Sequence, residues 1–203
     1  PDHLLSLIAM ANNELARFHP EKAWELAQHA WRVVTVRNFH PESGELDYLR
    51  GRILETLHRP EEALDAYLQA AWAQDARSRA MTRAAMVELR LSRWHDALAH
   101  AEEALRQHAH SETAMLARIV ALRHLGSPQA ETALAAAEAF DCLNVTLRAL
   151  KYGAAPALYA TLQSDPCQSA LDMAQDLTDL GETALAAEIL GGLPQPCAMT
   201  AYV

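Results

Sequence analysis

The sequence predicts an all-α protein built from about five to six antiparallel helical hairpins. The first observation is composition, because 41 alanines and 30 leucines stand against only 11 valines and isoleucines. Alanine and leucine have high helix propensity, whereas strands favour β-branched and aromatic side chains, so an extensive sheet is not expected. With 51% hydrophobic and 21% charged residues, the 203-residue chain is too apolar for disorder and can bury a sizeable core.

The second observation is an internal repeat of about 34 residues, which is typical of helical solenoids. Residues 59–64 (RPEEAL) recur 34 positions later as 93–98 (RWHDAL), and a second interval of 34 leads from Trp94, the counterpart of Pro60, to Pro128. An upstream copy begins at Pro20, 40 residues before Pro60. Because proline suits the first position of a helix and acidic residues favour the first turn, each copy predicts the start of a hairpin's second helix.

Small side chains recur around each copy and predict close packing of the two helices. Intervals of 12, 4 and 3 residues separate the members of three sets, which are Gly51, Ala63, Tyr67 and Ala70; Ala85, Ala97, Ala101 and Ala104; and Ala11, Ala23, Ala27 and Ala30. A fourth set needs a one-residue slip after Pro128, and a fifth begins at Ala174, with Gly126 and Gly181 marking their turns. The pattern therefore predicts a stack of helical hairpins.

The pattern places twelve helices along the chain and leaves two irregular stretches. The helices are expected at about 3–18, 20–37, 45–57, 60–76, 78–92, 94–109, 111–125, 128–140, 143–152, 155–163, 168–180 and 182–191. Residues 37–44 are expected to form a long loop, and 141–167 fit the repeat poorly. Because no linker rich in Pro, Gly or Ser divides the chain, one solenoid over 1–203 is expected, regular over 1–140 and degenerate over 141–203.

These features resemble the tetratricopeptide repeat (TPR) family, which the set beginning at Gly51 matches best. The family has a small residue in the first helix, another early in the second helix, and an aromatic residue four positions later. The other sets depart from this pattern, because Ala27, Ala101 and Leu134 stand where the aromatic residue belongs. In the best copy, Asp75 stands in place of the usual closing proline.

The resemblance covers about residues 3–140 well and 168–193 loosely, and it implies a right-handed superhelical solenoid that binds proteins. A weaker resemblance, over the last third, is to helical arrays of large bacterial proteins that carry a mutarotase-like β-sandwich. The chain begins at Pro1 without a methionine, and its apolar tail over 191–203 looks like the opening of another helix. A fragment of a larger protein is therefore expected.

Charge and cysteine content argue against several functions. The formal net charge is −9, with acidic residues dominating 141–203, which opposes binding to a nucleic-acid backbone. No apolar run approaches the length of a membrane span and no signal peptide is recognised, so neither nucleic acid nor membrane is an expected partner. The three cysteines are scattered without CxxC spacing, which fits a reducing cytoplasm better than a disulfide framework or a zinc site.

The titratable residues do not indicate catalysis or metal binding. His95 and His100 have a spacing of five, which is poor for two ligands on one helical face, and no HExxH motif occurs. Adjacent acids such as Glu61 and Glu62 diverge on a helix by about a hundred degrees and do not converge on one atom. GxSxG, P-loop and GxGxxG motifs are also missing from the sequence, so neither an enzyme nor a cofactor is expected for this segment.

The candidate site is the concave groove, which in TPR arrays is lined by the first helix of each hairpin. Transferring the family's register to this sequence implies a ligand groove lined by Asn12, Tyr48, Arg52, Arg79, Met86, Arg90 and Arg123. The four arginines are expected to form a basic stripe, because guanidinium groups bind carboxylates bidentately. The alternative is that these arginines pair with nearby glutamates and recognise nothing specific.

The resulting prediction is a protein–protein interaction scaffold that binds a peptide or a partner domain. The prediction includes self-association and the binding of another domain of the same polypeptide. The arginines favour an acidic partner, although codon bias in a GC-rich genome would also explain why 15 arginines accompany two lysines. A second hypothesis is an accessory helical-repeat domain of a carbohydrate-active enzyme, or of a bacterial regulator, with the active domain elsewhere in the chain.

Overall fold

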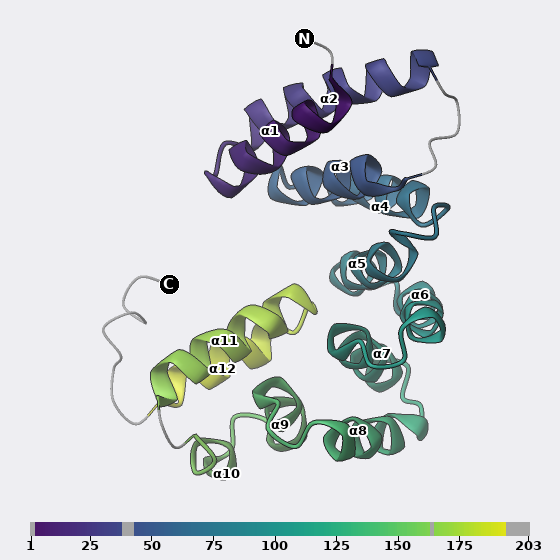
Figure 1. The fold of residues 1–203 in the computed structure, drawn as a ribbon. Helices are drawn as coiled ribbons and strands as arrows, with labels where there is room; N and C mark the ends of the chain where they lie inside the picture. The colour runs from purple at the N-terminus through teal and green to yellow at the C-terminus, as the bar shows by residue number, and fades with distance from the viewer. Residues whose placement is uncertain (1–2, 38–42, 163–164, 194–203) are drawn as a thin grey trace.

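All regular elements of the described chain are α-helices, as the composition predicts. The computed structural model describes residues 3–37, 43–162 and 165–193, and these ranges hold twelve helices and no strand. Successive helices pair as hairpins, and the pairs stack into a curved array (Figure 1). Most of the loop expected at 37–44, and the tail beyond residue 193, lie outside the described residues.

The helix pairs follow the predicted spans closely. They are α1 (Leu4–Ala16) with α2 (Pro20–Arg37), α3 (Glu45–Thr56) with α4 (Pro60–Ala70), α5 (Arg77–Arg90) with α6 (Trp94–Gln107), α7 (Glu112–His124) with α8 (Gln129–Phe140), α9 (Val145–Tyr152) with α10 (Pro156–Tyr159), and α11 (Pro166–Asp179) with α12 (Thr183–Gly191). Two elements are shorter than predicted. The helix α10 has only four residues, and α4 ends at Ala70 because residues 71–76 form turns that a small alanine cluster closes.

The small residues of the three repeated sets are the contact points within the hairpins, and every member is buried. Gly51 shows why size matters there, because a Cβ built on it would lie 2.5 Å from Cε1 of Tyr67. In the hairpin of α5 and α6, Ala101 stands in place of the tyrosine and Ala85 in place of the glycine, and both are 0% exposed. The glycine and the tyrosine therefore compensate each other in volume, as close packing requires.

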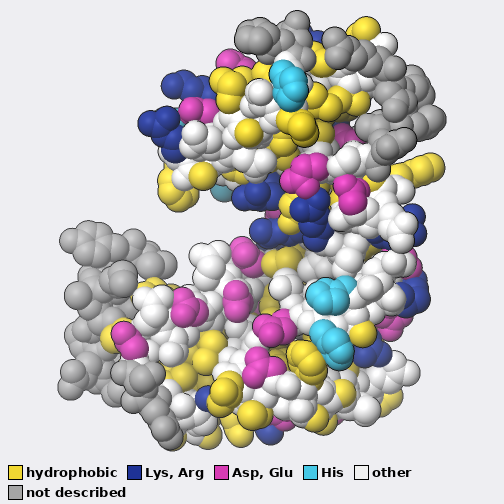
Figure 2. Space-filling model, viewed as in Figure 1, with side chains coloured by type: hydrophobic (Ala, Val, Ile, Leu, Met, Phe, Trp, Pro, Cys, Tyr) yellow, Lys and Arg dark blue, Asp and Glu magenta, His cyan; other side chains and the backbone are white. Residues whose placement is uncertain are grey.

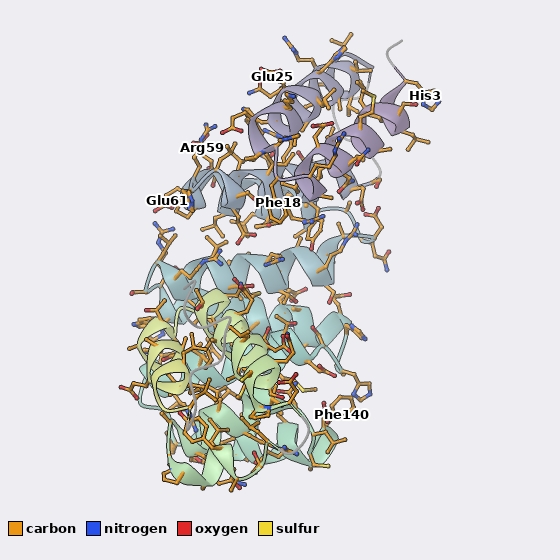
Figure 3. The ribbon with its side chains drawn as sticks, turned by 90° about the vertical axis from the view of Figure 1, so that its left-hand side faces the viewer. His3, Phe18, Glu25, Arg59, Glu61 and Phe140 are labelled. Atoms are coloured by element: carbon orange, nitrogen blue, oxygen red, sulfur yellow. The ribbon has the colours of Figure 1, made fainter. Side chains whose placement is uncertain are left out.

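The turn between the two helices of each regular hairpin contains a residue in the left-handed conformation. These residues are Phe18 (φ 59°), His58 (φ 56°), Ser92 (φ 58°), Gly126 (φ 63°) and Gly181 (φ 84°). Each turn has the two hydrogen bonds of a Schellman motif, for example 3.0 Å from His58 N to Glu55 O and 2.9 Å from Arg59 N to Leu54 O. At the first turn, Phe18 is exposed (Figure 3).

Neighbouring hairpins are also joined by ion pairs between equivalent helices. Arg79 of α5 pairs with Glu45 of α3, and Nη2 of Arg93 in the α5–α6 turn lies 2.6 Å from Oε1 of Glu61 in α4. Figure 3 shows Glu61 beside Arg59 at this edge of the array. Because the side chains are partly exposed, each pair contributes little to stability.

The last hairpin turns back onto the middle of the array. Helix α11 contacts both α9 and α5, and a Cβ on Gly181 at the α11–α12 turn would lie 3.3 Å from the backbone of Leu89. In the same turn Glu182 is bonded to His124 of α7, with 2.6 Å between Oε1 and Nε2. One buried cluster therefore runs from α5 to α12, and Figure 1 shows α11 beside α9 with one end toward α5.

The cysteines differ in state. Cys142 is a free, exposed thiol, whereas Cys167 is disulfide-bonded, a bond that the expectation of no disulfide framework did not anticipate. The expectation rested on spacing along the chain, and spacing does not report the distance between side chains in the fold. No helix within the described ranges has the length and apolar character needed to span a membrane.

Candidate interaction groove

A cavity of about 470 Å³ lies on the concave side of the array. Its walls come from α3, α5, α7 and α11 and from the loops that precede α5 and α7. The lining residues are Tyr48, Asp75, Ser78, Arg79, Thr82, Arg83, Met86, His108, Ser111, Thr113, Asp176 and Asp179. Figure 2 shows a hollow between the α1–α4 end and the α11–α12 hairpin, with basic side chains above it and acidic side chains below.

One face of α5 supplies most of the cavity floor. Arg79, Thr82, Arg83 and Met86 follow the i, i+3, i+4, i+7 spacing of one helical face, so their side chains project from the same side of the helix. Thr82 and Met86 are buried, with 7% and 5% of their surface exposed. The Arg79 guanidinium lies over the ring of Tyr48 from α3, with 4.6 Å between Cζ and the ring centroid. The base of the cavity is therefore apolar, and its edge is basic.

Three of the seven predicted groove residues line this cavity, namely Tyr48, Arg79 and Met86. Arg79 is ion-paired with Glu45, which comes from the preceding hairpin. Met86 lies deeper than the family's register implies, because it belongs to the buried cluster that continues into α11 and α12. The register therefore points to the face of α5 that lines the cavity, while the surrounding helices decide how open that face is.

The other four predicted residues lie outside the cavity and are bonded to protein groups. Arg52 donates from Nη1 to Oδ1 of Asn12 over 3.4 Å and so joins α3 to α1. Arg90 is paired with Glu55 of α3, and Arg123 donates to a backbone carbonyl of α9. In this arrangement the three arginines connect successive inner helices.

Glu55 is the centre of a charged network beside the cavity. Its carboxylate accepts hydrogen bonds from the Tyr67 hydroxyl and from Arg90, and Nη1 of Arg83 lies 4.0 Å away. Burial, reinforced by the Glu55 charge, raises the pKa of Tyr67 far above its ordinary value, so the phenol stays a donor. Burial alone would lower the pKa of Arg83, but Glu55 and the nearby tyrosines raise it. Arg83 therefore enters the cavity as a cation that Glu55 already compensates.

Asp75 occupies the position of the family's closing proline and holds the start of the preceding hairpin. Its Oδ2 accepts a hydrogen bond of 2.6 Å from the Ser43 hydroxyl, and its Oδ1 accepts one of 3.1 Å from the Gly44 N–H. These two bonds, with the charge of Arg79 nearby, hold the pKa of Asp75 below its ordinary range. Asp75 thus ties the α4–α5 connection to the start of α3.

The wall opposite α5 is acidic, and the transferred groove register did not include it. Asp176 and Asp179 of α11 line the cavity. Asp176 accepts a hydrogen bond of 2.7 Å from the hydroxyl of Thr146, which is 0% exposed, and Asp179 accepts one of 3.2 Å from Nε2 of Gln175. The acidic C-terminal third was visible in the sequence, but only the return of α11 brings it opposite α5. No group of three or more His, Cys, Asp or Glu side chains in the described segments is placed to hold a metal ion.

The fold and the cavity define a class: a solenoid of TPR-like helical hairpins with a concave groove. Solved structures confirm this fold. The TPR-like repeats of a chain assigned as a kinesin light chain from Podosopora anserina align with 95% of this chain and 93% of their own, at 16% identity and a TM-score of 0.58. A point variant of the same repeats aligns over 100% and 98%, at 16% identity and a TM-score of 0.60.

A third structure, Naa15/Naa10 bound to HypK-THB, aligns with 100% of this chain at 18% identity and a TM-score of 0.51. This chain spans only 33% of that longer one. No family model and no curated protein sequence matches the chain. At these identities the likeness establishes the architecture, and the resemblance to TPR repeats read from the sequence is confirmed at the level of the fold.

Proposed function

We propose that the chain is a protein–protein interaction scaffold whose concave cavity binds an extended segment of a partner. The observation that carries the proposal is the cavity of about 470 Å³ on the inner face of the array. Its volume is in the range of ligand-binding clefts, and rigid helices surround it on several sides. An extended peptide suits such a groove because its side chains can enter the cavity while its backbone follows the array.

The architecture of the neighbours agrees with this proposal. One of them, Naa15/Naa10, has HypK-THB bound, so a TPR-like array of that kind holds a protein partner. Within the present chain, the polar lining offers several hydrogen-bonding groups at the cavity mouth, including Ser111, Thr113 and His108. A partner segment could therefore be oriented by polar contacts above an apolar floor of Tyr48 and Met86.

The test blocks the cavity without disturbing the core. Thr113 lines the cavity and is exposed, so Thr113→Trp should be tolerated and should fill the mouth. Thr132 is an equally exposed threonine on α8, away from the cavity, and Thr132→Trp is the matched control. Dodecapeptides selected from a random phage library on the immobilised chain would be measured against both variants by fluorescence anisotropy.

We expect Thr113→Trp to weaken the selected peptides by about tenfold or more and Thr132→Trp to leave their affinity unchanged. Equal affinity for the two variants, with both folded by circular dichroism, would show that the cavity is not the binding site.

A further inference from the structure

We infer that the segment bound in this cavity carries a basic side chain, which the carboxylates of Asp176 and Asp179 on α11 receive. The inference rests on the proposed function and goes further, because it assigns the charge of the partner. It also reverses the acidic partner that the arginines alone suggest. The argument depends on which charges of the cavity are already compensated by the protein itself.

The basic side chains of the cavity already have acidic partners. Arg79 is ion-paired with Glu45, and Nη1 of Arg83 lies 4.0 Å from the carboxylate of Glu55, which also pairs with Arg90. Each of these glutamates comes from α3, so the compensation is built into the contact between two neighbouring hairpins. An acidic ligand would therefore have to compete with carboxylates that are already in place.

The acidic side chains of the opposite wall have neutral partners. Asp176 accepts from Thr146 and Asp179 accepts from Gln175, and neither forms an ion pair with a cation in the described part of the chain. The two aspartates are three residues apart on α11, so their charges lie on the same side of the helix and repel each other. A cation placed between them would relieve this repulsion, which gives a basic ligand group an advantage over a neutral one.

The surroundings of Asp176 suit such a group. Thr146 is 0% exposed and its hydroxyl lies 2.7 Å from Oδ2 of Asp176, so this carboxylate is held in place before any ligand arrives. Carboxylate oxygens have further lone pairs, so Asp176 can still accept from a ligand. Across the cavity, Tyr48 and Met86 offer apolar surface to the aliphatic stem of a lysine or arginine. The net charge of −9 would also attract a basic segment from a distance.

The test compares peptides that differ in one charge. Five fluorescein-labelled decapeptide pools share the same randomised neutral positions and carry lysine, arginine, norleucine, aspartate or glutamate at the centre. The protein variants are Asp176→Asn/Asp179→Asn, which removes the acidic wall, and Asp172→Asn as control. Asp172 is an exposed aspartate on the same helix that does not line the cavity. Affinities would be measured by anisotropy at two salt concentrations.

We expect the lysine and arginine pools to bind the wild type about three- to tenfold tighter than the norleucine pool, and more weakly at high salt. The double variant should lose this preference, whereas Asp172→Asn should keep it. Tighter binding of the acidic pools, or a basic preference that survives in the double variant, would overturn the inference while peptide binding stands. Binding of no pool, or binding that Thr113→Trp does not weaken, would overturn the proposed function together with the inference.

Discussion

Glu88 and His100 form a largely buried pair that joins the two helices of the third hairpin. Glu88 is 3% exposed, and its Oε2 lies 2.7 Å from Nδ1 of His100, whose side chain is 25% exposed. The hydrogen bond to Glu88 raises the pKa of His100 and outweighs burial, which would lower it. Because a buried carboxylate needs a partner, the protonated imidazole stabilises the folded state.

The stability contributed by this pair should depend on pH. The folded-state pKa of His100 is raised above the ordinary value of 6.5, so its contribution is complete below about pH 6.5 and is lost as the pH rises through the folded-state pKa. The free energy of unfolding should therefore fall as the pH rises above about 6.5 and through the folded-state pKa, by on the order of 1–2 kcal/mol. His100→Gln should flatten this dependence in urea titrations across the same range.

His95→Gln is the matched control for this pH dependence. His95 lies on the same helix α6 and is exposed, so its replacement should leave the pH dependence of the wild type in place. A profile for His100→Gln that follows that of the wild type would mean that another group is responsible.

At the scale of the element, the hairpin turns share one backbone conformation although their residues differ. Phenylalanine, histidine, serine and glycine all occur at the left-handed position. For residues with a Cβ this conformation costs roughly 1–2 kcal/mol, whereas glycine adopts it freely. The Schellman hydrogen bonds and the packing of the two helices must therefore outweigh the strain at Phe18, His58 and Ser92.

Replacing His58 by glycine should stabilise the protein. His58 is exposed, so the change relieves strain without removing buried contacts, although the more flexible unfolded chain offsets part of the gain. We expect about 0.5–1 kcal/mol of added unfolding free energy, measured by urea denaturation. The reverse change, Gly126→Ala, should destabilise by a similar amount, because φ is 63° and alanine is strained in that conformation. A Cβ there would contact nothing within 4 Å, so backbone strain is the only expected effect. Opposite signs for both variants would show that turn conformation does not limit stability.

At the scale of the whole molecule, the array closes on itself. The α11–α12 turn packs against the end of α5, so helices separated by two intervening hairpins share one buried cluster. This closure supplies the acidic wall of the cavity and buries Met86. The candidate site is therefore a property of several stacked hairpins and not of any single repeat.

The closure can be tested by comparing two glycines. Gly181 and Gly126 both have positive φ, but a Cβ on Gly181 would also lie 3.3 Å from the backbone of Leu89. Gly181→Ala should therefore destabilise more than Gly126→Ala, since the turn must move away from α5 as well as accept strain. Amide hydrogen exchange should show faster exchange in α11 and α12 for Gly181→Ala alone. Equal exchange in the two variants would contradict a tight contact between this turn and α5.

The elements were largely predictable because each depends on local signals. Proline and acidic residues mark the starts of second helices, and the spacing of small residues marks the faces that touch. The end of α4 was missed because its last predicted turn was helical in propensity, whereas Ala70 and Ala76 pack together across a turn instead. Tertiary contact overrode propensity there.

The candidate site was only partly predictable. Tyr48, Arg79 and Met86 follow from the register of a single hairpin, because that register decides which side of a helix faces inward. Asp176 and Asp179 could not be placed, since their position opposite α5 depends on the summed rotations of every hairpin between them. The partners of Arg52, Arg90 and Arg123 could not be predicted either, because they lie in other hairpins. Spacing along the chain does not report the distances between hairpins.

The sequence by itself determined the helices, their pairing and the small residues on which they stack, because these follow from periodicity over one or two turns. Only the tertiary structure decided which charges compensate each other and which remain for a ligand. A charge interacts with whatever lies within a few ångströms, and in a solenoid those neighbours come from other repeats. Arg79 and Arg90 found partners in the hairpin before them, whereas the aspartates of α11 lie on the opposite wall of the cavity.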